Sequence, residues 1–144
     1  MATTLRGVIF DWRGTLAVTP SDIEWCRLAL QRLGRKHDER AAADLLAQIE
    51  AAPGVERLEA HGVDASATLH RETYLSVFSD AGLDADLRET LYALEADPAL
   101  NPFAEDVVEI LRSVKGLGLR VAILSDIHFD IRPAFVICII GCRC

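Results

Sequence analysis

Two short apolar runs frame the chain, and each of them ends at a polar residue. Residues 6–10 finish with Val-Ile-Phe before Asp11, and residues 119–124 read Leu-Arg-Val-Ala-Ile-Leu before Ser125. Short apolar runs of β-branched residues that stop at turn-forming positions are typical of buried strands. The pattern therefore predicts one strand over 6–10 and a second over 119–124.

Between and around these runs, apolar residues recur at the spacing of amphipathic helices. Ser21 and Glu24 form a Ser-x-x-Glu capping pattern, which marks the start of the first helix. A last helix is expected to begin at Ser125 and run toward Phe135, although the apolar segment 135–140 is also suited to a third strand. The first helix is predicted over 21–34, and the remaining helices over 39–51, 66–81, 85–96 and 104–115.

The order of these elements predicts an α/β fold in two parts. The helix over 104–115 supplies the crossover that two parallel strands need. Four helices are inserted after the first strand, at the carboxyl end where open α/β sheets bind ligands. We therefore expect residues 1–19 and 100–144 to form a core with a parallel sheet, and residues 20–99 to form a helical cap.

Composition and charge exclude several classes of protein. Hydrophobic residues make up 51% and charged residues 26%, which is a globular composition. The formal net charge of −7 argues against non-specific binding to nucleic acid. No apolar run approaches the roughly 20 residues that span a bilayer, and Asp11 interrupts the one apolar stretch near the N-terminus. These features predict a soluble, cytoplasmic protein without nucleic-acid or membrane partners.

The first motif with chemical potential is Asp-Trp-Arg-Gly-Thr-Leu, at residues 11–16. A carboxylate at the carboxyl end of a strand projects into the ligand crevice, where it can act as a nucleophile. Gly14 permits a tight turn whose N–H groups can cradle an anion. The alternative interpretation is that Asp11 only ends the strand or caps the next turn.

The second motif is Leu124-Ser125-Asp126, also at the end of a strand. Its serine hydroxyl can donate a hydrogen bond to a phosphoryl oxygen. The alternative is an ordinary helix cap, for which Ser and Asp are favoured. Adjacent parallel strands would bring Asp11 and Ser125 together, so the two motifs support one another.

Taken together, the motifs resemble those of the haloacid dehalogenase superfamily. Residues 8–16, Val-Ile-Phe-Asp-Trp-Arg-Gly-Thr-Leu, look like its first motif, and residues 121–126, Val-Ala-Ile-Leu-Ser-Asp, look like its second. The inserted helices look like the family's cap, and Asn-Pro-Phe at 101–103 resembles the return to the core. The resemblance covers residues 5 to about 135. It implies a Rossmann-like parallel sheet, incomplete here, with an inserted α-helical cap.

The resemblance also implies a hydrolase of the phosphatase type. Asp11 would attack the phosphorus of a small phosphorylated metabolite and form an aspartyl-phosphate. Mg²⁺ would bind the Asp11 carboxylate and the backbone carbonyl of Arg13, and Ser125 would bind the transferring phosphoryl group. The residues implied in substrate binding are Arg13, Gly14, Thr15 and Asp126.

Departures from the family pattern lower the expected activity. The family's phosphatases carry an Asp two residues after the nucleophile as general acid and base, whereas this chain has Arg13. A guanidinium stays protonated and cannot shuttle a proton, a loss that typically costs on the order of 10²–10⁴ in rate. Dehalogenases and phosphonatases of the superfamily also lack that Asp. The residues after Asp126 contain neither the Lys nor the paired carboxylates of the later motifs.

The composition changes shortly after Pro133, where the sequence becomes Val-Ile-Cys-Ile-Ile-Gly-Cys-Arg-Cys. We expect a truncated or frame-shifted product of a longer gene, with feeble or no activity. Reading the downstream DNA in all frames tests this expectation. The Cys-x3-Cys-x-Cys spacing of the last three cysteines matches no strong zinc pattern.

Other interpretations stay open at this point. One is dehalogenation through an ester on Asp11, which needs no metal, and another is a non-catalytic fragment whose helices bind a partner. Trp12 is expected either at the mouth of the pocket or against the cap. A short sheet with an exposed edge favours a homodimer. Four histidines show no ligand spacing and are expected to be surface or helix residues: His37, His61, His70 and His128.

Overall fold

A computed structural model of the chain describes residues 5–125 and 127–135. These residues form two compact units, which are considered one at a time. The strand unit comprises residues 5–19, 101–125 and 132–135, and the helical unit comprises residues 20–100 and 127–131. The assignment of these parts as a catalytic core and a cap stays a prediction.

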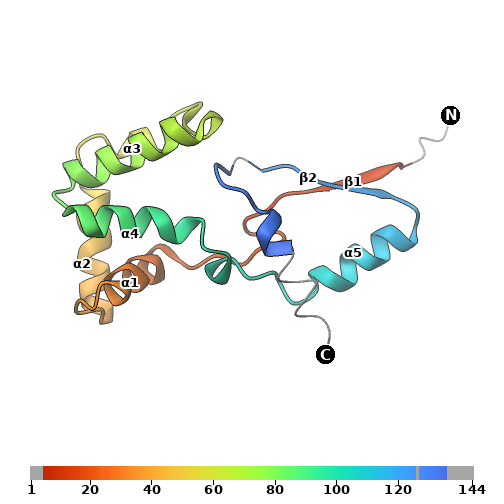
Figure 1. Ribbon diagram of the computed structural model, residues 1–144, viewed down its shortest axis with the longest axis horizontal. Helices are drawn as coiled ribbons and strands as arrows, with labels where there is room; N and C mark the ends of the chain where they lie inside the picture. Colours follow the sequence, from red (N-terminus) through yellow and green to blue (C-terminus); the bar gives the residue numbers. More distant parts are fainter. Residues whose placement is uncertain (1–4, 126, 136–144) are drawn as a thin grey trace. The chain divides into compact units, whose positions relative to one another are not determined.

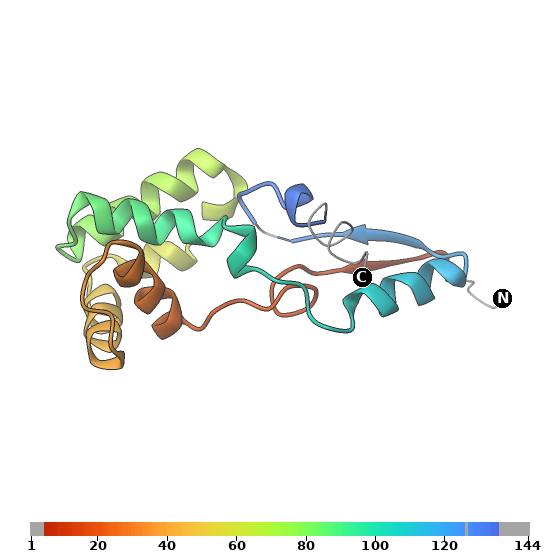
Figure 2. The same cartoon turned by 60° about the horizontal axis from the view of Figure 1, so that its bottom comes forward.

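The strand unit is built on two parallel strands, β1 (Gly7–Phe10) and β2 (Arg120–Ile123). Both predicted strands are confirmed, and they run side by side in Figures 1 and 2 with Gly7 opposite Arg120 and Phe10 opposite Ile123. Helix α5 (Val107–Gly116) precedes β2 and packs against it. The unit is therefore a strand–helix–strand crossover with a long insertion after the first strand.

The expected Rossmann-like parallel sheet core is wrong for the described residues. A doubly wound sheet has several strands and helices on both faces, whereas this sheet has two strands of four residues each. Its uncovered positions are apolar, since the side chain of Ile9 is 67% exposed and that of Leu124 is 71% exposed. Most of the described residues are helical, so the α/β motif is one small part of a mainly helical chain.

An aromatic cluster fills the small core of the strand unit. The Trp12 side chain is fully buried, with its ring centroid 5.3 Å from that of Phe103 and 5.7 Å from that of Phe135. Leu16 and Ala17 are buried in the same unit. Trp12 thus packs within the core of the strand unit itself.

The helical unit contains four α-helices, all of which were predicted from apolar spacing. Side-chain oxygens of Ser21, Asp38, Ser66 and Asp84 cap their amino termini by accepting from backbone N–H groups. The capping pattern at Ser21 is confirmed, because its Oγ accepts from the Glu24 N–H at 3.3 Å. The helices are α1 (Asp22–Arg32), α2 (Glu39–Glu50), α3 (Ala67–Asp80) and α4 (Ala85–Glu95).

The core of the helical unit is made where these helices pack on one another. Helix α1 packs against α2 and α4, and α3 packs against α4. Burial raises the pKa of the Cys26 thiol to about 12, so this cysteine is a core residue and is inert as a nucleophile. Three short turns of tighter helix, η1 (Val55–Glu59), η2 (Val63–Ala65) and η3 (Pro98–Leu100), complete the connections. The largest buried side chains include Cys26, Val77, Phe78, Leu91 and Leu94.

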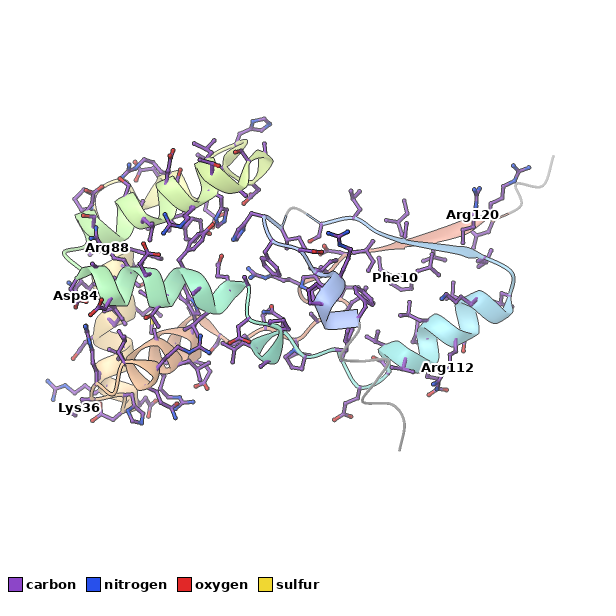
Figure 3. The ribbon with its side chains drawn as sticks, viewed as in Figure 1. Phe10, Lys36, Asp84, Arg88, Arg112 and Arg120 are labelled. Carbon is purple, nitrogen blue, oxygen red and sulfur yellow. The ribbon has the colours of Figure 1, made fainter. Side chains whose placement is uncertain are left out.

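An exposed ion pair links two segments of the helical unit that are distant in sequence. Arg35, just after α1, donates two hydrogen bonds to the carboxylate of Asp84 at 2.6 and 2.9 Å. Asp84 is at the amino end of α4, as Figure 3 shows. The paired carboxylate also caps that helix, so one side chain links two elements that are distant in sequence.

The helix expected from Ser125 onward begins later than predicted. Residues 127–131 have no regular structure, and helical turns start only at Arg132. A helix that ran from Ser125 to Phe135 would hold Pro133 in its interior, where proline breaks the hydrogen-bond ladder. Beginning at Arg132 puts Pro133 in the first turn, where proline is favoured. The alternative third strand over 135–140 lies almost wholly outside the described residues.

A search of the described helices for a membrane-crossing segment finds none with the required length and apolar character.

Candidate functional site

The two predicted motifs leave the sheet at neighbouring positions. The N–H of Leu124 donates to the carbonyl of Phe10 at 3.0 Å, which extends the parallel pairing to the last residue of β1. Figure 3 marks Phe10, the residue immediately before Asp11. Phe10 is paired with Ile123. Asp11 therefore follows β1 by one residue, and Ser125 follows β2 by two. The sheet register therefore brings Asp11 and Ser125 to one edge, as adjacent parallel strands require.

The carboxylate of Asp11 is exposed and partly fixed in orientation. Its Oδ1 accepts a hydrogen bond from the N–H of Trp12 at 2.7 Å. Because the indole of Trp12 is buried in the strand unit, the donor N–H is anchored and the carboxylate plane is restrained. Asp11 is thus a solvent-accessible carboxylate on a rigid support, which is what a nucleophile at a strand end needs.

The N–H groups of the turn that were expected to be able to cradle an anion form hydrogen bonds within the loop. The N–H of Gly14 donates to the carbonyl of Ala17 at 2.9 Å, and those of Leu16 and Ala17 donate to the carbonyl of Trp12 at 2.9 Å. The N–H of Thr15 also donates to Trp12, at 3.4 Å. These donors close the loop on itself, so the N–H groups of residues 14–17 do not face a bound anion in this conformation.

Glycine is required at position 14 for the loop to close in this way. Gly14 has a φ of +72°, in the left-handed region that other residues rarely adopt. The loop is then tied to the return segment, since Val18 donates to Pro102 at 2.9 Å and Ala104 donates to Leu16 at 3.0 Å. The predicted return from the insertion at 101–103 therefore lies directly against the 12–17 loop.

The remaining predicted site residues lie around this loop and at the end of β2. The side chain of Thr15 is exposed, while Arg13 and Ser125 are half-buried. Gly14 is exposed and so leaves the backbone accessible on that side. Asp126, expected to contribute to substrate binding, lies outside the described residues.

Oxygen ligands near Asp11 suit a hard cation such as Mg²⁺, but they are few. The predicted pair is the Asp11 carboxylate and the backbone carbonyl of Arg13, and Mg²⁺ prefers such oxygens and keeps several of its waters. Among the residues that the structure describes, the group of three or more potential metal ligands lies elsewhere, in the helical unit. The residues at Asp11 therefore fit a weakly held Mg²⁺ whose coordination is completed largely by water.

A second polar cluster, in the helical unit, was missed by sequence reasoning. His70 on α3, Glu95 at the end of α4 and His128 in the irregular segment after β2 bring their potential ligand atoms within 4.8 Å of one another. The charge of Glu95 also reaches Tyr92, whose pKa is raised first by burial and then by that carboxylate. No spacing in the sequence could have revealed the cluster, because its members come from three separate elements.

Comparison with known proteins adds no family assignment. No protein-family model matches the sequence, and no curated protein or solved structure matches it significantly. The resemblance to the haloacid dehalogenase superfamily therefore rests on the sequence itself, namely on the two motifs and on the helices between them.

Proposed function

We propose that the Asp11 loop carries out phosphoryl transfer from a small phosphorylated metabolite in the cytoplasm, through an aspartyl-phosphate on Asp11. One observation carries the proposal: β1 and β2 are parallel and in register up to their carboxyl ends. Asp11 follows β1 by one residue and Ser125 follows β2 by two, so a carboxylate and a hydroxyl donor leave the sheet at the same edge. The resemblance to haloacid dehalogenase-type hydrolases supplies the expected reaction.

The first chemical step follows from the orientation of the Asp11 carboxylate. The N–H of Trp12 holds Oδ1 at 2.7 Å, which leaves Oδ2 as the attacking oxygen. Oδ2 forms a bond to phosphorus while the bond from phosphorus to the leaving oxygen breaks. The hydroxyl of Ser125 donates to a phosphoryl oxygen as charge accumulates there. Water then attacks the aspartyl-phosphate and releases inorganic phosphate, which regenerates the carboxylate.

Arg13 limits this reaction, because both steps involve a proton that a guanidinium cannot carry. An alkoxide leaving group needs a proton in the first step, and the attacking water has to lose one in the second. A nitrophenolate leaves without protonation, so the first step on a nitrophenyl ester avoids the handicap. Turnover is therefore expected to be slow, with the aspartyl-phosphate accumulating when the leaving group is good.

The proposed cofactor is Mg²⁺, held by the Asp11 carboxylate and the carbonyl of Arg13 with water completing the shell. When bound, it neutralises part of the negative charge on the phosphoryl group. The guanidinium of Arg13 lies in the same loop and offers a fixed positive charge for the same anion.

The test compares 4-nitrophenyl phosphate with an alkyl phosphate, each with and without Mg²⁺. We expect slow, Mg²⁺-dependent release of nitrophenolate that disappears in Asp11→Asn and is unchanged in Asp106→Asn, an exposed carboxylate of the same unit. Arg13→Asp should raise kcat/KM on the alkyl phosphate by about 10²-fold, because it restores a general acid. Activity that survives in Asp11→Asn would refute the proposal.

One alternative reaction is favoured by a specific residue. Halide leaves without a proton, so Arg13 in place of an acid is compatible with dehalogenation through an ester on Asp11. Turnover of a haloacid that persists in the presence of chelator would establish that reaction instead. If neither substrate class is turned over, the chain is a non-catalytic binding module instead.

A further inference from the structure

Three potential metal ligands meet inside the helical unit, remote in sequence from the Asp11 loop. His70 belongs to α3, Glu95 is the last residue of α4, and His128 belongs to the irregular segment 127–131. One ligand atom from each lies within 4.8 Å of the other two. The side chains are 3%, 13% and 7% exposed, respectively, so the cluster is shielded from solvent.

Within the cluster, carboxylate oxygens lie close to imidazole nitrogens. Nε2 of His128 lies 3.6 Å from Oε2 of Glu95, and Nε2 of His70 lies 3.5 Å from Oδ1 of Asp64. The Asp64 side chain is 40% exposed, so it forms the edge of the cluster nearest to solvent. Placing a largely buried carboxylate beside two largely buried rings is unfavourable unless the charge is balanced. A bound cation balances it directly.

We propose that His70, Glu95 and His128 form a binding site for a zinc-type divalent transition-metal ion. Imidazole nitrogen with one carboxylate oxygen suits Zn²⁺, Co²⁺ or Fe²⁺, whereas Mg²⁺ and Ca²⁺ prefer oxygen alone. Three protein ligands leave a fourth position for water. This site is independent of the proposed phosphoryl transfer at Asp11, and neither depends on the other.

The hydrogen bond between His70 and Tyr92 supports ligation by His70. Nδ1 of His70 lies 3.3 Å from the hydroxyl oxygen of Tyr92. In the tautomer with its proton on Nδ1, the ring donates to Tyr92 and Nε2 carries a lone pair, so the approach of Asp64 to Nε2 at 3.5 Å is favourable only with a cation bound there. Partners of this kind fix the orientation of metal-binding histidines, and their loss typically weakens metal affinity by about 10–100-fold.

Binding requires a modest rearrangement of the two imidazoles. Their centroids are 3.5 Å apart, and their planes are inclined by 19°. A ligating nitrogen directs its lone pair in the ring plane, so two stacked rings cannot both bind one ion until one of them turns. Bond lengths of about 2.0–2.1 Å also require ligand atoms about 3.3 Å apart. His128, on a segment without regular structure, is the side chain that turns and closes the site.

The test is a Co²⁺ titration of the full chain, followed by displacement with Zn²⁺. The three tail cysteines are replaced by serine in every sample, because thiolates would compete for the ion. We expect one equivalent of Co²⁺ with visible ligand-field bands, and displacement by Zn²⁺. The imidazole resonances of His70 and His128 should shift, while those of the exposed His37 and His61 should not.

Substitutions assign the ligands. His128→Gln and Glu95→Gln should each weaken Co²⁺ binding by about 100-fold or more, and Tyr92→Phe by about 10-fold, since a lost ligand costs at least as much as a lost orienting partner. His61→Gln is the matched control and should bind like the parent. Circular dichroism checks that each variant keeps its helices. If the parent binds no Co²⁺, or if His128→Gln and Glu95→Gln bind it like the parent, the site does not exist.

Discussion

The two units of this chain bury their apolar residues very differently. The helical unit has a continuous core drawn from four capped helices, whereas the strand unit is centred on Trp12 and leaves Ile9 and Leu124 largely exposed. A small core supplies little stability, because burial scales with the apolar area removed from water. The candidate nucleophile is therefore carried by the part of the chain with the smaller stabilising core, so changes in the stability of that unit are expected to affect the proposed function directly.

The largest effect is expected from Trp12→Ala. Removing a fully buried indole from the strand unit should cost about 3–5 kcal/mol, which is enough to unfold a small core. The helical unit should remain folded, because its core contains no residue of the strand unit. The measurement is urea unfolding followed by circular dichroism, which reports both units, and by the fluorescence of Trp25, the remaining tryptophan, which reports the helical unit alone.

The reciprocal substitution removes a buried side chain from the helical unit instead of the strand unit. Leu91→Ala, at a fully buried position of the helical unit, should lower the free energy of unfolding of that unit by about 2–5 kcal/mol. Trp25→Phe in the same background leaves Trp12 as the reporter of the strand unit. An equal loss at both tryptophans would mean that the two units unfold as one, contrary to the account.

A smaller effect is expected from the uncovered face of the sheet. Ile9→Thr keeps a β-branched residue in β1 but removes apolar area that a second copy of the chain could bury. If the predicted homodimer forms through this face, its association free energy should weaken by about 1–2 kcal/mol, or roughly tenfold. Sedimentation equilibrium measures this, with Leu69→Gln on exposed α3 as the control.

The smallest effect concerns the pH dependence of the helical unit. The side-chain hydrogen bond from Arg35, followed by the backbone N–H of Leu87, lowers the pKa of Asp84 to about 2. A lowered folded-state pKa gives stability that is present above the unfolded value, near 4, and is lost as the pH falls toward 2. Unfolding midpoints should therefore decline over that window.

Asp84→Asn isolates the charge in that experiment, because Asn is also a good amino-terminal cap for α4. The variant should show a shallower decline between pH 4 and pH 2 than the parent. Asp44→Asn, an exposed carboxylate on α2, is the matched control. A slope that is unaffected by Asp84→Asn would exclude this ion pair as its source.

Local signals in the sequence were sufficient for most of the elements. Apolar spacing predicted the helical stretch 85–96, which the structure has as α4 (Ala85–Glu95). The pairing of β1 with β2 also followed from two apolar runs and a crossover helix. The helices depend on neighbouring residues, and the strand pairing depends on two apolar runs and the crossover helix between them, so short sequence patterns were enough for both.

Features that depend on distant residues were not predictable in this way. The extent of the sheet depends on which other segments pair with it, and the motif resemblance wrongly implied a Rossmann-like core. The segment after Ser125 favoured helix locally, yet its His128 ring stacks on His70 instead. The internal hydrogen bonds of the 12–17 loop likewise appear only once the loop has closed on itself.

The central claim, that Asp11 becomes phosphorylated, can be tested by chemical trapping. The chain is incubated with 4-nitrophenyl phosphate and Mg²⁺, quenched, and reduced with borohydride, which converts an aspartyl-phosphate to homoserine. Peptide mass spectrometry should find homoserine at position 11 in the parent, and none there in Asp11→Asn or without the substrate. Homoserine absent from position 11 of the parent, or found only at another aspartate, would contradict the account.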